Sequence, residues 1–77
     1  MRITIEMHGP LQRYNKGGQA RAELELKDGL TVHDALASLG MDMAEPWNAA
    51  LNGTLARPAD LLSDGSFLLV FPPIEGG

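Results

Sequence analysis

The residues with the clearest chemical potential are the last eight, VFPPIEGG, at positions 70–77. The two final glycines lack a Cβ and permit close backbone approach to another molecule. Pro72 and Pro73 have a fixed φ and no N–H, so they end a strand ladder and direct the last four residues outward. Fully extended, the chain after Phe71 would reach roughly 20 Å. The pattern predicts an extended tail whose last carboxylate, on Gly77, has a function of its own.

A second candidate lies directly before the tail, where FLLVF predicts a strand that is apolar on both faces. If Leu68 and Val70 face the core, then Phe67, Leu69 and Phe71 share the opposite face. Contiguous exposed apolar side chains often mark an interface, so we expect these three to bind a partner. The alternative is that loops or other strands of the chain cover them.

Other reactive groups are sparse. The sequence has no cysteine, and His8 and His33 stand apart from each other, which predicts no metal site. Gly17-Gly18 is not followed by the Lys-Ser/Thr pair of a phosphate-binding loop. The chain lacks a general-base constellation, and we expect no catalytic residues of its own.

The elements that must position the tail begin with two strands. RITIEM at 2–7 alternates apolar and polar residues, and ARAELELK at 20–27 does the same before an Asp28-Gly29 turn. These segments predict an antiparallel hairpin. Between them, 8–18 is interpreted as a loop in which Leu11 and Tyr14 tuck back against the domain.

The apolar period then changes to that of a helix over 31–39, with Thr31 as N-cap and Asp34 completing a capping box. A short strand at 47–51 ends in the turn pair Asn52-Gly53. The turn-rich segment after this pair is expected to bury three leucines, and the last strand is SFLLVF. The leucines are Leu55, Leu61 and Leu62.

This order predicts an α+β fold: a mixed sheet with one helix packed across one face, and the first and last strands as central neighbours. A chain of 77 residues has room for one core, so we divide it into a domain at 1–71 and an extended tail at 72–77.

Charge and hydropathy exclude several classes of partner. The net charge of −4, without a basic block, disfavours nucleic acid and favours a partner with a basic groove. The start MRITIEMHGP alternates and is no signal peptide, and no stretch approaches the roughly 20 apolar residues of a membrane helix. We expect a soluble, cytoplasmic protein with no membrane partner.

The predicted order resembles the ubiquitin-like β-grasp fold. The ending resembles the sulfur-carrier family that includes the small subunit of molybdopterin synthase and the thiamine-biosynthesis sulfur carrier. The likeness lies in Asn52-Gly53 after a short apolar strand, in LLSDGSFLLVF at 61–71 and in PPIEGG at 72–77. HGPLQRY at 8–14 looks like the family's loop after the first strand. The double proline favours the molybdopterin branch.

The resemblance implies that a partner related to ubiquitin-activating enzymes adenylates the Gly77 carboxylate with ATP. Sulfur then displaces AMP, and the resulting thiocarboxylate gives its sulfur to a large synthase subunit or another sulfur-accepting enzyme. The carrier would bind no cofactor, because ATP is used by the partner. The tail residues that would thread into the partner are Pro72, Pro73, Ile74, Glu75, Gly76 and Gly77.

Three other functions fit the same residues. The sulfur could serve thiamine, a tungsten-type pterin cofactor or another pathway. The chain could be a ubiquitin-like modifier that is joined to lysines through Gly77. It could also be a β-grasp interaction module with an inert tail. Gene neighbours and the mass of the native chain would separate these functions.

Overall fold

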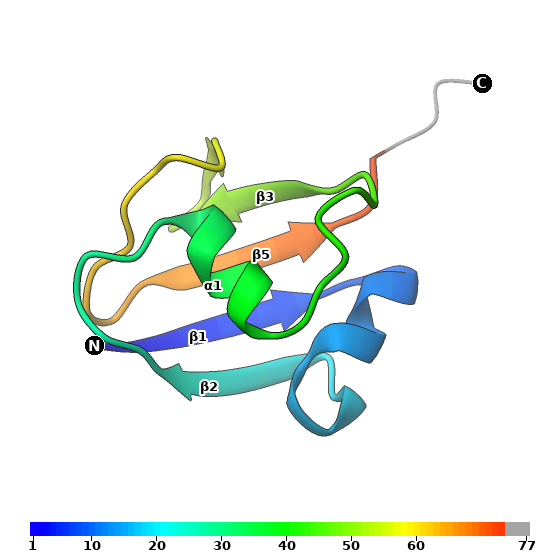
Figure 1. The fold of residues 1–77 in the computed structure, drawn as a ribbon, viewed down its shortest axis with the longest axis horizontal. Coiled ribbons are helices and arrows are strands. Elements are labelled where there is room, and N and C mark those ends of the chain that lie inside the picture. Colours follow the sequence, from blue (N-terminus) through cyan, green and yellow to red (C-terminus); the bar gives the residue numbers. More distant parts are fainter. Residues whose placement is uncertain (74–77) are drawn as a thin grey trace.

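Five strands, one α-helix and two 3-10 helices make up residues 1–73, the part of the chain that this computed structural model describes (Figure 1). They are β1 (Arg2–Met7), η1 (Gly9–Tyr14), η2 (Lys16–Gly18), β2 (Arg21–Glu25), α1 (Val32–Ser38), β3 (Asn48–Leu51), β4 (Thr54–Ala56) and β5 (Phe67–Phe71). The strands form one sheet in the order β2-β1-β5-β3-β4, with β1 and β5 parallel and the other neighbours antiparallel. The predicted mixed sheet, the initial hairpin and the central pair of first and last strands are confirmed.

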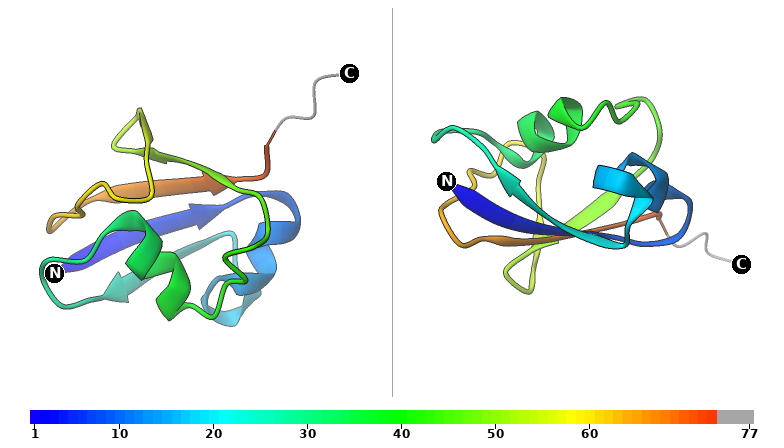
Figure 2. Two further views of the ribbon diagram at one scale, coloured as in Figure 1. Left: turned by 45° about the horizontal axis from the view of Figure 1, so that its top comes forward. Right: turned by 90° about the horizontal axis from the view of Figure 1, so that it is seen from below.

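The core lies between the sheet and α1, which covers one face of it (Figure 2). Ile5 and Met7 on β1 and Leu68 and Val70 on β5 have no exposed surface, because the period of two turns these side chains towards the helix. Burial of each such side chain contributes about 1.5–3 kcal/mol before the entropy of ordering is subtracted. No helix within residues 1–73 lies on the other face of the sheet, which we call the open face.

Helix α1 begins with the predicted capping box. Thr31 Oγ1 accepts from the Asp34 N–H at 3.2 Å, and Asp34 Oδ2 accepts from the Thr31 N–H at 3.0 Å. A helix of seven residues is marginal in water, so its stability comes from burying Val32, Ala35 and Leu36 against the sheet. No helix within residues 1–73 has the length and hydropathy needed to cross a bilayer.

The segment 8–18, interpreted as a loop, folds instead into η1 and η2. Pro10 stands in the first turn of η1, where a missing N–H costs nothing, and short-range backbone bonds such as Asn15 N–H to Gln12 carbonyl, at 3.0 Å, close the turns. Leu11 is buried and Tyr14 is half-buried, as predicted. The 3-10 helices therefore give the tail-proximal end of β1 a firm surface.

The prediction that three leucines are buried is wrong for two of them. Leu62 is 5% exposed, but Leu55 is 72% and Leu61 is 67% exposed. Asn52 and Gly53 both have positive φ, 51° and 87°, and form a two-residue turn that fixes the β3–β4 register. That register turns Leu55 to the open face. Leu61 lies outside the strands, where only its backbone bridges to α1's N-cap residue.

Adjacent leucines provide a matched test of this burial. Leu62→Ala should lower the free energy of unfolding by about 2–4 kcal/mol, because it leaves a cavity beside the core. Leu61→Ala should change it by no more than about 0.5 kcal/mol. Urea unfolding followed by the fluorescence of the single tryptophan measures both. Equal losses in the two variants would contradict the placement.

Candidate functional site

The tail leaves the sheet at the end of its central strand. β5 is paired with β1 on one side and with β3 on the other, and it ends at Phe71, opposite Asn48 (Figure 1). Pro72 is half-buried and Pro73 is exposed. The structure thus describes the root of the predicted tail. Four predicted tail residues lie outside the described residues: Ile74, Glu75, Gly76 and Gly77.

Pro72 leaves β5 in close contact with the first residue of η1. Gly9 has a φ of +58°, and a Cβ built there would lie 3.5 Å from Pro72 Cγ. The left-handed backbone favours glycine here, whereas the distance to Pro72 is that of an ordinary van der Waals contact. Beside this contact, a concavity of about 350 Å³ adjoins the root. It is lined by Pro10, Leu11, Glu45, Pro46, Pro72 and Pro73.

A polar network fastens the wall of this concavity. Arg13 Nη2 donates to both carboxylate oxygens of Glu45 at 2.8 Å, and the Tyr14 hydroxyl donates to Glu45 Oε2 at 2.7 Å. The Arg13 guanidinium also lies 4.4 Å from the centroid of the Tyr14 ring. The hydrogen bonds from Tyr14 and Arg13 hold the pKa of the Glu45 carboxyl below its usual value. The hydrogen bond between Tyr14 and Glu45 also raises the pKa of Tyr14. Sequence reasoning missed this network.

The predicted alternation along β5 is confirmed. Leu68 and Val70 are fully buried, and Phe67, Leu69 and Phe71 are half-buried on the open face. These three side chains are thus neither fully exposed nor fully covered by the chain. Their role in partner binding stays a prediction.

The open face also carries two apolar residues on β3 and β4 that the sequence analysis did not place there. Ala50 on β3 lies opposite Leu69, and Leu55 on β4 lies opposite Ala50. We call Phe67, Leu69, Phe71, Ala50 and Leu55 the apolar strip. The two-residue turn before Leu55 could have predicted that its side chain lies on the open face, because that turn type fixes the register of the hairpin.

Charged residues on β1 and β2 border the apolar strip. Arg21 donates to Glu6 Oε1 at 2.7 Å, and His8 Nε2 lies 2.7 Å from Glu6 Oε2. These two hydrogen bonds, the one with His8 first, hold the pKa of Glu6 below its usual value. Arg21 also lies 5.4 Å from the centroid of the Phe67 ring, a cation–π distance. The Arg21 guanidinium thereby lies over the ring of Phe67, one residue of the apolar strip.

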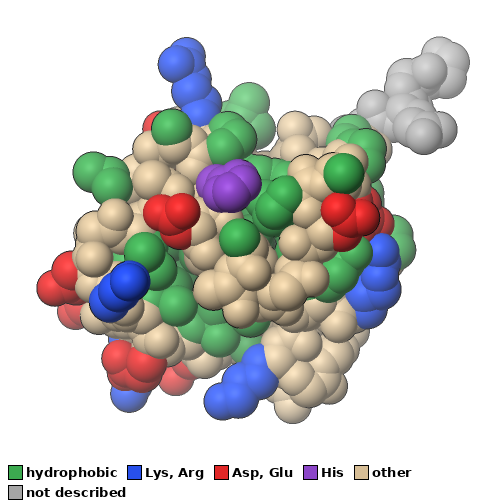
Figure 3. All heavy atoms as spheres, viewed as in Figure 1, with side chains coloured by type: hydrophobic (Ala, Val, Ile, Leu, Met, Phe, Trp, Pro, Cys, Tyr) green, Lys and Arg blue, Asp and Glu red, His purple; other side chains and the backbone are tan. Residues whose placement is uncertain are grey.

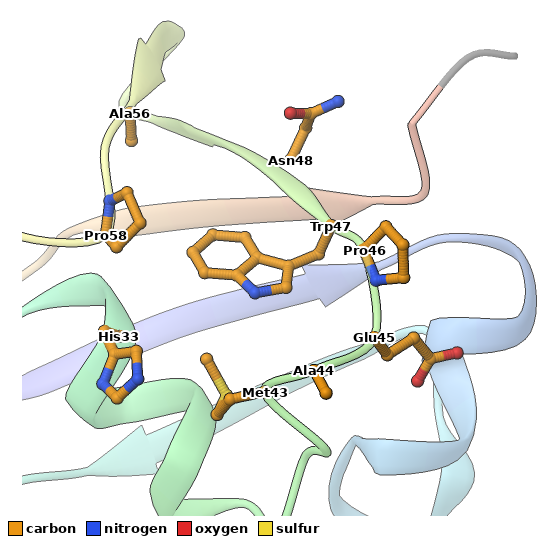
Figure 4. A pocket seen from close by; sticks show the side chains of 9 residues that line it. All are labelled: His33, Met43, Ala44, Glu45, Pro46, Trp47, Asn48, Ala56 and Pro58. Atoms are coloured by element: carbon orange, nitrogen blue, oxygen red, sulfur yellow. The ribbon is translucent and has the colours of Figure 1, made fainter.

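A second concavity, of about 380 Å³, lies on the helix side of the sheet (Figure 4). The indole of Trp47 spans it, with His33 of α1, Met43 and Pro58 around it. Figure 3 shows hydrophobic side chains gathered beside a histidine on this face, with charged side chains towards the edges. Within residues 1–73, no three His, Cys, Asp or Glu side chains lie where they could hold a metal ion. Trp47 is half-buried.

Comparisons with known proteins agree with this architecture. The model of the ThiS family matches residues 9–77. SAMP1 from Haloferax volcanii is 21% identical, with full coverage of both chains (100% and 100%) and a TM-score of 0.77. A proposed molybdopterin converting factor subunit 1 from Pyrococcus furiosus is 22% identical over 95% of this chain and 98% of that chain, with a TM-score of 0.76.

A third solved structure is a complex of subunits 1 and 2 of molybdopterin-converting factor from Helicobacter pylori. Its matching chain is 19% identical over 100% of each chain, with a TM-score of 0.64. At such identities these likenesses concern the fold. They confirm the predicted ubiquitin-like β-grasp.

The lowered pKa of Glu6 predicts a pH-dependent contribution to stability. The ionised carboxylate stabilises the folded chain above its unfolded pKa, and this contribution is lost as the pH falls through the lower folded pKa. Glu6→Gln should therefore destabilise the chain at neutral pH and differ progressively less from wild type towards about pH 3. Urea unfolding across this range measures the difference.

Glu23→Gln is the matched control, because Glu23 is exposed and makes no ion pair within the described residues. Its unfolding free energy should follow that of wild type across the same pH range. A Glu6→Gln effect that does not vary with pH would refute the assignment of the shift to the ionised form.

Proposed function

The chain belongs to the ThiS family, and from this we propose that it is a sulfur carrier protein whose C-terminal Gly77 carboxylate becomes a thiocarboxylate. An ATP-dependent adenylating enzyme activates the carboxylate, and sulfur then displaces AMP. Residues 1–71 serve as the folded body that partners hold, and residues 72–77 carry the reacting group. The carrier supplies no catalytic residue and binds no cofactor in this proposal, and ATP-dependent activation fits the expected cytoplasmic location.

The observation that supports this proposal best is the placement of the tail root on the sheet's central strand. β5 is hydrogen-bonded on both sides and ends at Phe71, so the tail starts from the best-supported backbone of the domain. The prolines at 72 and 73 offer no N–H that could extend the sheet. A reacting group mounted in this way can enter a partner while the body stays outside.

The chemistry also explains why a carrier without catalytic residues is sufficient. A carboxylate is a poor acyl donor until one of its oxygens is joined to a phosphate in a mixed anhydride. The partner enzyme forms this anhydride and consumes ATP in doing so. The partner must then hold the carbonyl carbon near the incoming sulfur, so proximity and electrostatic stabilisation belong to the partner. The carrier needs only to present Gly77 in an accessible, narrow segment.

For the sulfur acceptor we propose the large subunit of a molybdopterin synthase, with the chain as its small subunit. The double proline supports this assignment, as do the fold likeness to the Pyrococcus furiosus protein and to the subunit of the Helicobacter pylori complex. The thiamine pathway or another sulfur pathway is the alternative acceptor. In every case the carrier and its acceptor meet through the tail.

A second candidate function is protein modification through an isopeptide bond between Gly77 and a lysine. The observation that favours it is the fold likeness to SAMP1 from Haloferax volcanii, whose other solved structure is described as a small archaeal modifier protein. Activation by adenylation would be common to both functions, and only the final acceptor differs. The state of Gly77 in the host therefore separates them.

We further propose that the apolar strip is the surface that partners bind next to the tail. Phe71 and Leu69 stand on the strand that leads into the tail, and Leu55 is the most exposed large apolar side chain of the strip. Burying such side chains supplies binding energy that ion pairs at an exposed border do not. The proximity of strip and tail would let one contact both hold the body and align the tail.

The state of Gly77 is the primary test of the proposed function. Intact-mass measurement of the chain purified from its host should show a fraction in which sulfur replaces one terminal oxygen. Deletion of Gly77 should abolish adenylation and sulfur transfer while the thermal midpoint stays within about 2 °C of wild type. Conjugates linked through Gly77 to lysine, in place of the thiocarboxylate, would establish the modifier function.

Truncating side chains of the apolar strip tests its role in binding, with truncation of an exposed leucine outside the strip as the control. Leu69→Ala and Phe71→Ala should each weaken binding to the adenylating enzyme by about tenfold or more, because they remove apolar area from the contact. Leu61→Ala, outside the sheet strands and exposed, should leave binding unchanged. Calorimetric titration measures affinity, and urea unfolding verifies that each variant is folded. Unchanged affinity for folded Phe71→Ala would refute this docking surface.

A further inference from the structure

The direction in which the tail leaves the body matters because the tail is short. Gly77 is the fourth residue after Pro73, so the segment spans at most about 14 Å when extended. A rotation of about 10° at the root would displace the far end by about 2 Å. Displacements of this size are costly when a carboxylate must meet an active site. The root therefore needs support of its own.

Two segments distant in the sequence provide that support. On one side lies Gly9, at the start of η1, where a Cβ would be in ordinary van der Waals contact with Pro72, at 3.5 Å from Cγ and 3.8 Å from Cδ. On the other side, Glu45 and Pro46, from the connector between α1 and β3, share the concavity that Pro73 also lines. The root is thus bordered by η1 and by the connector.

The connector has no strand or helix of its own at 41–46; Met41 anchors its start in the core, and a backbone bond from the Glu45 N–H to the Asp42 carbonyl, at 3.0 Å, closes a turn. The hydrogen bonds of Arg13 and Tyr14 to the Glu45 carboxylate join it to η1 across 31 and 32 positions of sequence. Three such bonds to one carboxylate fix its orientation as well as its distance. The bond from Tyr14 is partly buried and 25% of the Glu45 side chain is exposed, whereas the two bonds from Arg13 lie at the surface.

We propose that Arg13, Tyr14 and Glu45 are positioning residues for the tail. They clamp the connector to η1 and so fix the two surfaces that direct Pro72 and Pro73 out of the sheet. The proposal rests on the proposed function, because an oriented tail has value only where a partner must receive it. None of the three residues touches the reacting carbon in this role.

The energetics argue against stability as the main role of the clamp. Half of the Arg13 side chain, 52%, is exposed, and ion pairs of this kind contribute little to global stability. Leu11, in the same helix, is 1% exposed and already anchors η1 to the core. A clamp that adds little to global stability but joins two segments at the tail root fits an orienting role.

Glu45→Gln tests the clamp, because it keeps the shape of the side chain and removes the charge that attracts Arg13 Nη2 to both carboxylate oxygens. Steady-state adenylation by the host enzyme, followed as ATP–pyrophosphate exchange, should show a KM for the carrier that rises about three- to tenfold. The kcat should stay within about twofold, because the enzyme holds the tail once it is bound. Tyr14→Phe, which removes one hydroxyl, should raise KM in the same direction by less.

Glu23→Gln is the control for the loss of one negative charge and should leave both constants unchanged. A second readout needs no enzyme: nuclear Overhauser effects between Gly9 and Pro72 should weaken in Glu45→Gln and persist in Glu23→Gln. Urea unfolding confirms that each variant is folded. If Glu45→Gln does not fold, the same comparisons with Tyr14→Phe decide the proposal.

The outcomes separate the two proposals. If the wild-type chain is not adenylated, the proposed function fails, and the Gly9–Pro72 contact alone decides whether the clamp orients the root. If wild type is adenylated and Glu45→Gln has the KM of Glu23→Gln, the clamp has no positioning role. A fall in kcat at unchanged KM, or an unaltered Gly9–Pro72 contact in folded Glu45→Gln, would also overturn it.

Discussion

The pairing of β5 on both of its edges is the constraint on which the rest of this molecule depends. Its parallel ladder with β1 and its antiparallel ladder with β3 fix the register of the last strand from two sides. Because the side-chain period is two, a slip of one residue would exchange the buried Leu68 and Val70 for the phenylalanines on the open face. The same register determines where the strand stops and the tail begins. Core, apolar strip and tail root are thus set together.

Much of this arrangement is local in origin, which is why the sequence predicted it. Alternation along β1 and β5, the helical period after Thr31 and the Asn52-Gly53 turn each depend on neighbouring residues. The prediction failed where burial depends on distant packing. Hydrophobicity alone could not distinguish Leu61, which points to solvent, from Leu62, which enters the core. The short backbone bonds of η1 and η2 likewise leave no strong periodic signal.

The candidate site shows the same division. Prolines and glycines identify the tail from their covalent structure, and the strand pattern places Phe67, Leu69 and Phe71 on one face. The clamp between η1 and the connector could not be predicted, because its residues meet only after the chain has folded back on itself. A single glutamate and an Arg-Tyr pair do not form a sequence motif that would predict their contact. Long-range polar contacts of this kind need coordinates.

The backbone at Gly9 has a consequence for how substitutions in this chain would be interpreted. Any other residue there would have to adopt a left-handed conformation and would bring a side chain against the ring of Pro72. In a genetic screen for loss of the function proposed for Gly77, position 9 should therefore be recovered alongside the tail itself. Such an allele would be classified by its phenotype with the last residues of the sequence, although it lies near the first.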